Sequence, residues 1–449
     1  MTAPSAYDQT SMAGAFKQRY GSKPVQFLPL ETKLRNATEF DSKNREGDKF
    51  NVMVTLTHSG GGTYAGSSLV RTAYDTNAAI PAASANAYVQ ATEYLHTEYV
   101  AYGAAFAAQG NDEASFVDSQ EYAVKNAVQG AAKRLESKFW YGGSPTADQA
   151  VKVCQGAGIG CLDAHSGSST TRVYTISAAT WSSVWLGAEN NQIDAVNITG
   201  AGTGTFSSLA VINTNAALTV TKIDAVNRKV TVSGNATDLT NIDAVGDTNV
   251  VFYWRGSFGQ TGLGVHQILG AKPLASTLFG IALGTYSFWD PVAIDEGGAP
   301  LSFNMVMAAC DSLAARGFAG KTNAYVSISQ WTDIMTDTDA ARRVDYSYRS
   351  GKVERGSEGV MFHGQTGPIE LIPHAYIKPG FYYVLGMDNW SRKGSTEITF
   401  DLPNGMPMWW NLPTNAGYGL RALAVEEMFC SKPSHNVMGY NVSPTHVIA

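Results

Sequence analysis

The sequence predicts an α+β protein that carries an inserted β-rich domain. Two observations lead to this prediction. From Asp112 to Phe139 the apolar residues keep a helical spacing, whereas most of the remaining chain is rich in glycine and short strand-like runs. Between His165 and Gly259 the composition changes to Thr, Ser, Asn, Val and Gly with few charges. The 449 residues suffice for two or three packed units, because single cores stop growing at about 250 to 300 residues.

Residues 1–49 are predicted to form an extended arm. Two prolines, Pro24 and Pro29, bracket an apolar run, and the residue before a proline avoids helical backbone. Cations outnumber acids around this run, where Glu31 alone opposes Lys17, Arg19, Lys23, Lys33 and Arg35. Such a cluster is either solvated or part of an arm that reaches an acidic surface of a neighbouring subunit.

Residues 50–85 are predicted to form a projecting loop. Apolar and polar side chains alternate from Phe50 to Leu56, which is typical of a strand. The Gly-rich segment from Ser59 to Thr63 would be the tip of the loop. Tyr64 to Val70 would return as the second strand of a long hairpin.

Within residues 86–164 we predict a strand followed by a long helix. The strand covers β-branched and aromatic residues from Tyr88 to Phe106, and the helix covers residues 112–139, with Asn111 placed to cap its start. At ~1.5 Å per residue this helix is roughly 40 Å long. Strand and helix, adjacent in sequence, should pack on one another. The buried face of the helix is expected to hold Phe116, Val124, Val128, Ala131, Leu135 and Phe139.

Residues 165–259 are predicted to be the inserted domain, a small β-barrel or sandwich. The tetrapeptide Ile-Asp-Ala-Val occurs at residues 193–196, 223–226 and 242–245. Because the spacings are unequal, we interpret it as an element that recurs near turns and not as a regular repeat. A hairpin is predicted from Leu218 to Val232, with its turn at Asn227.

Residues 260–415 are predicted to be a second α+β region. A helix should follow Pro300 and stop at Gly317, with one face formed by Leu301, Met305, Ala309 and Leu313. A buried strand is expected from Ala324 to Ile328, and a strand-rich region from Val360 to Leu385.

Residues 416–449 are predicted to be closing strands. Leu420 to Met428 and Ser434 to Val442 both have strand-like composition. We expect these two segments to close a sheet.

Composition excludes several classes of protein. The formal net charge is -6 and the pI about 5.8, so no global basic field would hold a nucleic acid. The four cysteines lack zinc-binding or dense disulfide spacing, which predicts reduced, buried thiols. No apolar stretch approaches the ~18 residues needed to cross a bilayer, and the start lacks an apolar signal region. We therefore expect a soluble protein made in the cytoplasm.

No catalytic, cofactor-binding or metal-binding residue is predicted, and the chain is not expected to be an enzyme. Gly61 to Ser68 resembles a phosphate-binding loop, but Ser67 stands where the lysine is needed, so a hairpin tip is favoured. Gly156 to Gly160 lacks the later glycine of a dinucleotide fingerprint and is interpreted as a loop. The eight histidines show no ligand spacing.

Two further clusters were considered as sites. An acidic and basic cluster could form an acid or ion site, but surface ion pairing is the favoured interpretation; it consists of Asp333, Asp337, Asp339, Arg342 and Arg343. Trp409 and Trp410 are adjacent and cannot both face one core from a strand. One of them meets a partner or an outer surface, or both lie in a buried corner of a loop.

The order of these parts resembles the tailed-bacteriophage major capsid proteins of the Hong Kong 97-type fold. Residues 380–391, Gly-Phe-Tyr-Tyr-Val-Leu-Gly-Met-Asp-Asn-Trp-Ser, resemble the strand of that family near its axial domain, and residues 426–438 resemble its returning peripheral strands. The resemblance implies an N-terminal arm (1–49), an extended loop (50–85), a peripheral domain (86–164) with a spine helix (112–139), an inserted β-rich domain (165–259), an axial domain with connections (260–415) and closing peripheral strands (416–449).

The function implied by this resemblance is that of a major capsid protein. Such a protein assembles with itself into hexamers and pentamers of an icosahedral head in the host cytoplasm, with scaffolding, portal and decoration proteins as further partners. The virion then encloses double-stranded DNA without sequence-specific binding, and no cofactor or membrane is involved. The alternative is a β-rich tail or host-attachment protein whose residues 165–259 bind a receptor or glycan, which leaves the long helix without a role. A hydrolase that uses Asp337 is a third hypothesis.

Overall fold

The computed structural model describes residues 32–60, 81–101, 119–270, 277–336, 360–400, 409–411 and 416–445, apart from 44, 47–48, 147, 168 and 204–208. The chain divides into two compact units. The first unit contains residues 93–135 and 396–425, and the second contains residues 31–92, 136–395 and 426–449. The predicted arm up to Glu31 lies outside the described residues.

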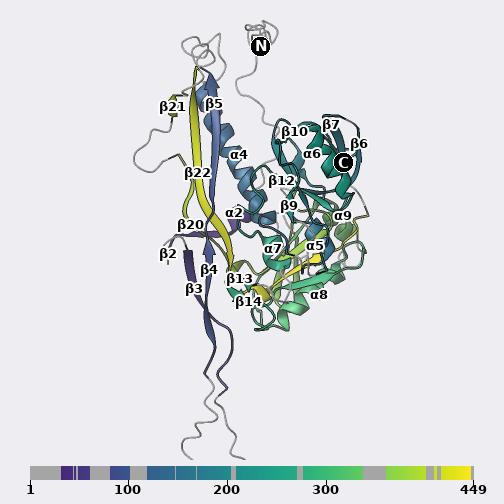
Figure 1. Ribbon diagram of the computed structural model, residues 1–449. Helices are drawn as coiled ribbons and strands as arrows, with labels where there is room; N and C mark the ends of the chain where they lie inside the picture. Colours follow the sequence, from purple (N-terminus) through teal and green to yellow (C-terminus); the bar gives the residue numbers. More distant parts are fainter. Residues whose placement is uncertain are drawn as a thin grey trace, which may run out of the picture. The chain divides into compact units, whose positions relative to one another are not determined.

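The first unit is a sheet with one long helix beside it (Figure 1). Strand β5 (Glu93–Ala101) pairs antiparallel with β22 (Gly417–Cys430) from Glu93 opposite Val425 to Ala101 opposite Gly417. Helix α4 (Ser119–Tyr141) approaches β5 so closely that a Cβ on Gly130 would lie 3.1 Å from the His96 ring. This confirms that the strand and helix adjacent in sequence pack on one another.

The face that α4 buries differs from the predicted one. Val128 is 38% exposed and Val124 is half-buried, so the prediction is wrong for these two residues. The buried row follows strict four-residue steps through Ala123, Ala127, Ala131, Leu135 and Phe139. Small alanines allow close approach to the sheet, whereas Val124 and Val128 lie about 100° further round the helix. The helix ends two residues later than predicted, and its predicted start lies outside the described residues.

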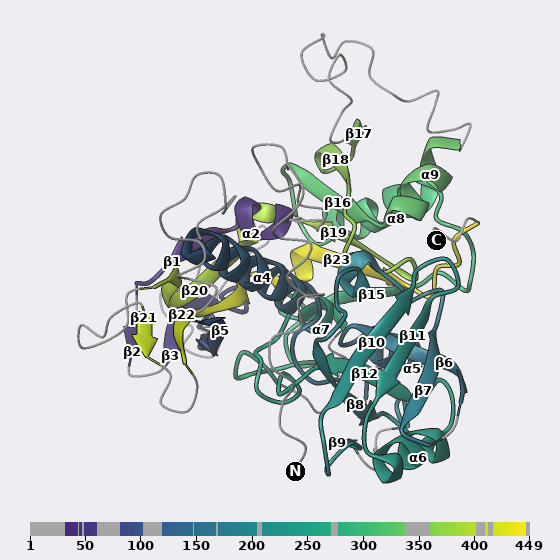
Figure 2. The same cartoon turned by 90° about the horizontal axis from the view of Figure 1, so that it is seen from above.

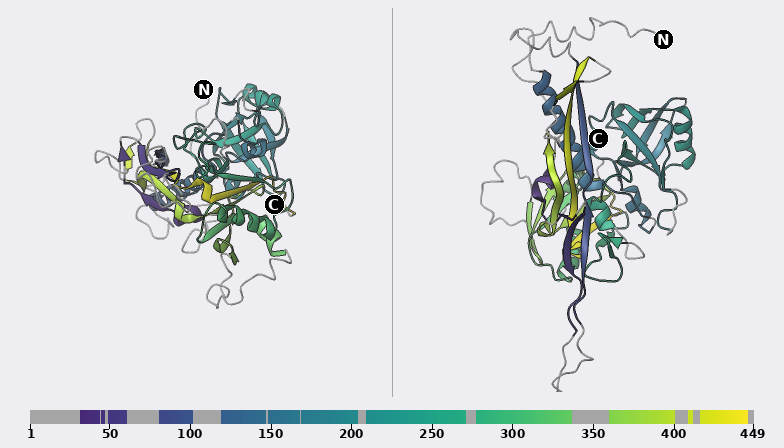
Figure 3. Two further views of the ribbon diagram at one scale, coloured as in Figure 1. Left: turned by 90° about the horizontal axis from the view of Figure 1, so that it is seen from below. Right: turned by 60° about the vertical axis from the view of Figure 1, so that its left-hand side comes forward.

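The second unit begins with a hairpin. Strand β3 (Lys49–Thr55) matches the predicted strand, but its partner is β4 (Ser84–Gln90). The predicted partner, Tyr64 to Val70, is therefore wrong for this strand and lies outside the described residues. Alanine-rich β4 has few β-branched residues, so its sequence gives only a weak strand signal. Figure 3 shows the narrow ribbon of β3 and β4.

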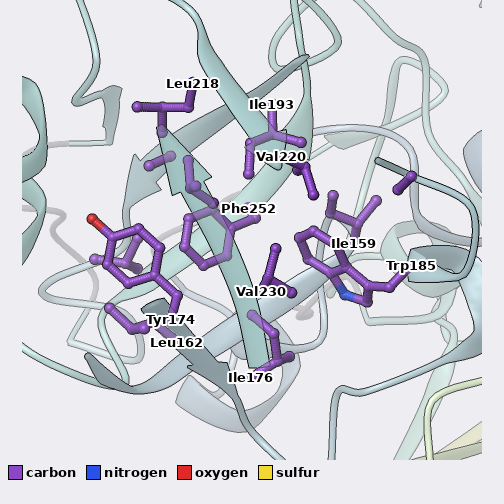
Figure 4. Packing of buried hydrophobic residues seen from close by; sticks show 14 of the residues in the cluster. Ile159, Leu162, Tyr174, Ile176, Trp185, Ile193, Leu218, Val220, Val230 and Phe252 are labelled. Atoms are coloured by element: carbon purple, nitrogen blue, oxygen red, sulfur yellow. The ribbon is translucent and has the colours of Figure 1, made fainter. Parts of the chain in front are cut away.

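The predicted β-rich region is a closed ring of strands. Pairings run in the order β10-β11-β7-β6-β12-β8, and β8 pairs back with β10, while β9 adds to β8. The strands are β6 (Gly160–Ser166), β7 (Thr171–Ile176), β8 (Gln192–Asn197), β9 (Ala210–Val211), β10 (Leu218–Asp224), β11 (Lys229–Ser233) and β12 (Val250–Trp254). Buried side chains such as Tyr174, Trp185 and Phe252 fill the interior (Figure 4). Of the two predicted forms, the structure shows the barrel.

The three Ile-Asp-Ala-Val segments adopt three different conformations. The first lies in β8, the second runs from the end of β10 into a turn, and the third lies in helix α6 (Ala236–Val245). The expectation of an element that recurs near turns is therefore wrong, because tertiary packing outweighs the local preference of four residues. The predicted hairpin from Leu218 to Val232 is confirmed as β10 and β11.

A six-stranded sheet forms another layer of the second unit (Figure 2). Its order is β15 (Val292–Asp295), β23 (Asn436–Tyr440), β19 (Phe381–Leu385), β16 (Thr322–Val326), β18 (Gly367–Pro373) and β17 (Val360–Gly364). Helix α8 (Phe303–Ala314) begins where the Ser302 hydroxyl accepts a hydrogen bond from the Met305 N–H, and Gly317 follows its end with φ of 81°. The predicted helix and the strands of the predicted strand-rich region are confirmed. The buried strand predicted from Ala324 to Ile328 is β16, which ends at Val326; Ile328 is 43% exposed and begins helix α9 (Ile328–Thr336).

The two closing segments are strands, but they belong to different sheets. β22 lies in a five-stranded sheet, whereas β23 lies in the six-stranded one. The expectation that both close one sheet is therefore wrong. The bend at Pro433, whose ring fixes φ, separates the two strands.

The part of the predicted arm (residues 1–49) that the structure describes is bound to its own chain, and residues 33–37 of it are helical instead of extended. Helix α2 (Lys33–Ala37) leads to β1 (Glu39–Asp41), which pairs in parallel with β20 (Trp390–Thr399). Lys33 Nζ donates to the Pro373 carbonyl oxygen at 2.7 Å. Lys33 thus binds its own chain and is not fully solvated.

The four cysteines are free and buried, as predicted. Burial raises the pKa of Cys154, Cys161 and Cys430 to about 12 and that of Cys310 to about 11. Among the described helices, none has the length and apolarity required to cross a membrane.

Candidate functional site

A carboxylate inside the second unit holds the start of helix α2. Glu136, near the end of α4, is fully buried. Its Oε1 accepts from the Leu34 N–H at 2.9 Å, and its Oε2 accepts from the Arg35 N–H at 3.1 Å. The first N–H groups of a helix have no partner within the helix, so this carboxylate fixes the chain where the described part of the predicted arm begins.

The same carboxylate has two further donors. His374 Nε2 lies 3.1 Å and Trp140 Nε1 3.3 Å from Oε1 of Glu136. His374 Nδ1 accepts from the Tyr376 N–H at 3.1 Å, so the hydrogen of the neutral ring is on Nε2 and points at Glu136. Donors from three chain segments therefore converge on one buried carboxylate.

Two more buried carboxylates lie side by side in sequence on β22. Glu426 is paired with Arg392 (Nη1 to Oε2, 2.6 Å) and with Arg35 (Nη2 to Oε1, 3.3 Å). Glu427 is paired with Lys138 (Nζ to Oε2, 2.8 Å). Adjacent strand residues face opposite sides of a sheet, so each carboxylate needs its own cation.

We name these six residues, Arg35, Glu136, Lys138, Arg392, Glu426 and Glu427, the charge network. Its cations and carboxylates balance, and each member belongs to the second unit. Burial of such a network stabilises little in net terms, whereas removal of one member leaves its partners charged and without water. The network therefore ties α2, α4, β20 and β22 to one arrangement.

The surroundings of Glu427 leave no space for another group. The Gly262 N–H donates to Oε2 at 3.2 Å, and the Thr92 hydroxyl donates to it at 2.7 Å. A Cβ on Gly262 would lie 2.4 Å from the carboxyl carbon of Glu427. Glycine is thus required at position 262.

Another buried cation, Lys378, lies where the chain enters the barrel. Lys378 Nζ donates to the carbonyl oxygens of Gly156 (2.6 Å), Ala157 (3.0 Å) and Gly158 (2.9 Å) and lies 4.0 Å from the centre of the Tyr141 ring. Burial lowers the pKa of Lys378 well below its usual value. The glycine-rich segment from Gly156 is a loop, as predicted, and its carbonyl groups bind this ammonium.

Replacing Lys378 with Met should lower the free energy of unfolding by about 1–3 kcal/mol, because three buried carbonyl groups lose their donor. Loss of the buried charge offsets part of this cost. Lys222→Met, at an exposed position of the barrel, should change stability by less than about 0.5 kcal/mol. Urea unfolding, monitored by tryptophan fluorescence, measures the stability of both variants. Equal midpoints for the two variants would contradict the role of Lys378.

His266 of helix α7 (Val265–Gly270) is a buried neutral group beside this lysine. Its Nε2 donates to the Val153 carbonyl oxygen at 2.8 Å, and its Nδ1 accepts from the Tyr383 hydroxyl at 2.9 Å. Burial, and then the charge of Lys378, lower the pKa of His266 to about 3 from 6.5. The neutral ring uses one donor and one acceptor, so protonation of Nδ1 would require the Tyr383 hydroxyl to accept a hydrogen bond instead of donating one.

This shift predicts a loss of stability in acid. As the pH falls below about 6.5, the unfolded chain binds a proton at His266 that the folded chain does not bind until about pH 3, so stability should fall between these values. The slope from this residue is at most about 1.4 kcal/mol per pH unit. His266→Gln should flatten the pH dependence of the urea midpoint, whereas His363→Gln, at an exposed position, should leave it unchanged. A slope unaltered by His266→Gln would refute the prediction.

The adjacent tryptophans lie on opposite sides of the sheet in the first unit. Trp409 of β21 (Trp409–Asn411) packs with Ala123 of α4. The Trp410 ring lies 4.0 Å from the guanidinium of Arg421 and 6.4 Å from the ring of Tyr99. Since Tyr99 is 62% exposed, the outer-surface alternative holds for Trp410.

The acidic cluster is only partly described. Asp333 is buried and not at the surface, because its carboxylate accepts from the backbone N–H (3.2 Å) and hydroxyl of Thr445. The surface prediction is wrong for this residue. The four other members, and Gly61 to Ser68, lie outside the described residues. Across the part of the chain that the structure describes, no group of three or more His, Cys, Asp or Glu residues could hold a metal ion.

Neither the charge network nor the role of Lys378 is predicted by the sequence pattern. Glu136 and Lys138 lie in a predicted amphipathic helix, where charged residues are expected to face solvent. Lys378 comes directly before Pro379 and Gly380, which are typical of an ordinary turn. A pair of adjacent glutamates within an otherwise apolar strand, Glu426 and Glu427, was the available signal.

The fold is that of a phage capsid protein. A chain of the cyanophage A-1(L) capsid asymmetric unit is similar, with a TM-score of 0.51 and 8% identity over 95% of this chain and 97% of that chain. A chain of the native GTA particle capsid has a TM-score of 0.45 and 9% identity, over 98% of this chain and 100% of that chain. A Mycobacterium phage Che8 chain has a TM-score of 0.42 and 8% identity, over 94% of this chain and 96% of that chain. The shared fold is shown by the first of these similarities, with its TM-score of 0.51.

Comparisons of sequence give no match. No family model matches the chain, and no curated protein matches it.

Proposed function

We propose that this chain is the major capsid protein of a tailed bacteriophage with the Hong Kong 97-type fold. The observation that carries the proposal is the likeness of almost the whole chain to a cyanophage capsid chain. The protein would form hexamers and pentamers of an icosahedral head that encloses double-stranded DNA. Its role is structural and not enzymatic, and assembly takes place in the host cytoplasm, with scaffolding, portal and decoration proteins as partners.

The domain assignment follows the same proposal. Residues 1–49 are the arm, 50–85 the extended loop, 86–164 the peripheral domain with its spine helix, 260–415 the axial domain and connections, and 416–449 the closing strands. Residues 165–259 are the inserted domain, which we extend back to Gly160 because β6 begins there. The first and last barrel strands, β6 and β12, are hydrogen-bonded neighbours. The chain thus enters and leaves the barrel at one place, which supports an insertion.

Electron microscopy of the purified full chain tests the proposal. We expect closed shells built from hexamers and pentamers, with or without a co-expressed scaffolding protein. Stable monomers under every assembly condition would overturn it. Binding of the chain to host cells would instead support a tail or attachment protein.

A further inference from the structure

A groove in the second unit opens beside strand β3. It has a volume of 470 Å³, within the range of about 300–1,000 Å³ that is usual for small-molecule sites. Three segments of the chain line it: Val52, Met53, Val54, Thr55, Leu56, Thr57 and His58 from β3 and its continuation, then Phe288 and Trp289, then Ser431, Lys432, Ser434 and His435 after β22. All of these residues belong to one compact unit, so the groove is a feature of that unit by itself.

The walls of the groove are apolar and aromatic. Leu56 and Trp289 are buried, whereas Phe288 is 45% exposed. The His58 ring meets the Phe288 ring edge-on at a centroid distance of 5.7 Å. An exposed aromatic ring beside buried apolar side chains suits a flat aromatic molecule, because apolar burial and ring–ring contact both favour binding.

Polar side chains of the lining are engaged within the chain. The Ser434 hydroxyl donates to the Phe288 carbonyl oxygen at 2.7 Å, and Trp289 Nε1 donates to the Leu278 carbonyl oxygen at 3.2 Å. These two donors are therefore not offered to a ligand. The walls favour a ligand whose body is apolar.

The electrostatic field at one end of the groove is positive. The lining includes Lys432 and no acidic residue. Lys432 is exposed, and among the described residues no carboxylate pairs with its ammonium. Burial, and then the charge of Lys432, lower the pKa of His435, and the charge of Arg316 acts in the same direction. A ligand with one anionic group would be attracted to this end.

We propose that the groove binds a small aromatic carboxylate, with its ring system against Phe288 and its anionic group at Lys432. The proposal does not depend on the proposed function, since every residue that lines the groove lies within one chain.

Isothermal titration calorimetry of the full chain tests the proposal with naphthylacetate and its neutral analogue, naphthylacetamide. We expect a Kd of about 1 mM or lower for naphthylacetate, which corresponds to an ordinary binding efficiency for a ligand of this size. The amide should bind at least about threefold more weakly, because it lacks the attraction to an exposed ammonium.

Two pairs of variants locate the ligand. Lys432→Gln should bind the acid and the amide equally, whereas Lys222→Gln, at an exposed position of the barrel, should keep the preference for the acid. Phe288→Ala should weaken the binding of both compounds about fivefold or more. Val226→Ala, at a position 70% exposed on the barrel, should leave binding unchanged. Circular dichroism and the urea midpoint show whether each variant is folded.

The outcomes are distinct from those that test the proposed function. Loss of the preference in Lys432→Gln together with weaker binding in folded Phe288→Ala would support the site. No binding of naphthylacetate by the full chain would overturn it, as would equal affinities for the acid and the amide. Binding that either variant leaves unaltered would place the ligand elsewhere and also overturn it. Shells in electron micrographs would in each case leave the capsid function intact.

Discussion

Replacing Leu135 with Asp should prevent the chain from folding. Leu135 is fully buried on α4, and loss of a buried leucine side chain alone costs about 2–5 kcal/mol. The new carboxylate would be buried without a cation, which adds a desolvation cost. The sum approaches the about 5–15 kcal/mol by which most domains are stable. Soluble yield, circular dichroism and size-exclusion chromatography measure the outcome.

The matched control is Val128→Asp on the same helix. At 38% exposure, the new carboxylate keeps contact with water, so the variant should be soluble, helical and less stable by only about 1 kcal/mol. If Val128→Asp also fails to fold, or if Leu135→Asp folds normally, the buried face of α4 is assigned incorrectly.

Replacing Glu136 with Ala should lower the free energy of unfolding by about 3–5 kcal/mol, the cost of removing one member of a buried ionic network. The substitution removes the Glu136 carboxylate that accepts from four donors: the Leu34 and Arg35 N–H groups, Trp140 Nε1 and His374 Nε2. Urea unfolding gives the stability. Hydrogen exchange gives a second readout, because the Leu34 and Arg35 amides should lose protection before the rest of the chain unfolds.

Glu189→Ala is the control for this variant. Glu189 is an exposed glutamate of the same unit, and its loss should change stability by less than about 0.5 kcal/mol. Slow exchange at Leu34 and Arg35 in Glu136→Ala would show that α2 is held by other contacts.

Elements with local signals could be predicted from sequence. Pro300 and Gly317 bracket α8, and alternating apolar residues mark β3, because such start and stop signals and periodicity act within a few residues. Alanine-rich β4 and the small residues on the buried face of α4 gave weaker signals than the valines nearby. In β4 and α4, close packing determined which residues are paired or buried, and apolarity alone did not.

The charge network could not be predicted because its contacts join residues far apart in sequence. Glu136 binds amides about a hundred positions earlier and an imidazole more than two hundred positions later. Spacing along one helix carries no information about such partners. The partners of Lys378 could not be predicted either, because its acceptors are backbone carbonyl groups and every residue has one.

The bonds from Glu136 to α2 also have a mechanical consequence. Tension applied to residues before Thr32 enters the described chain at α2, whose first N–H groups are bound to the end of α4. A force on the arm is thus resisted by the hydrogen bonds between α2 and Glu136 of α4, in addition to the pairing of β1. Any joint made by that arm therefore transmits its load to Glu136 together with the Lys33–Pro373 and Arg35–Glu426 contacts.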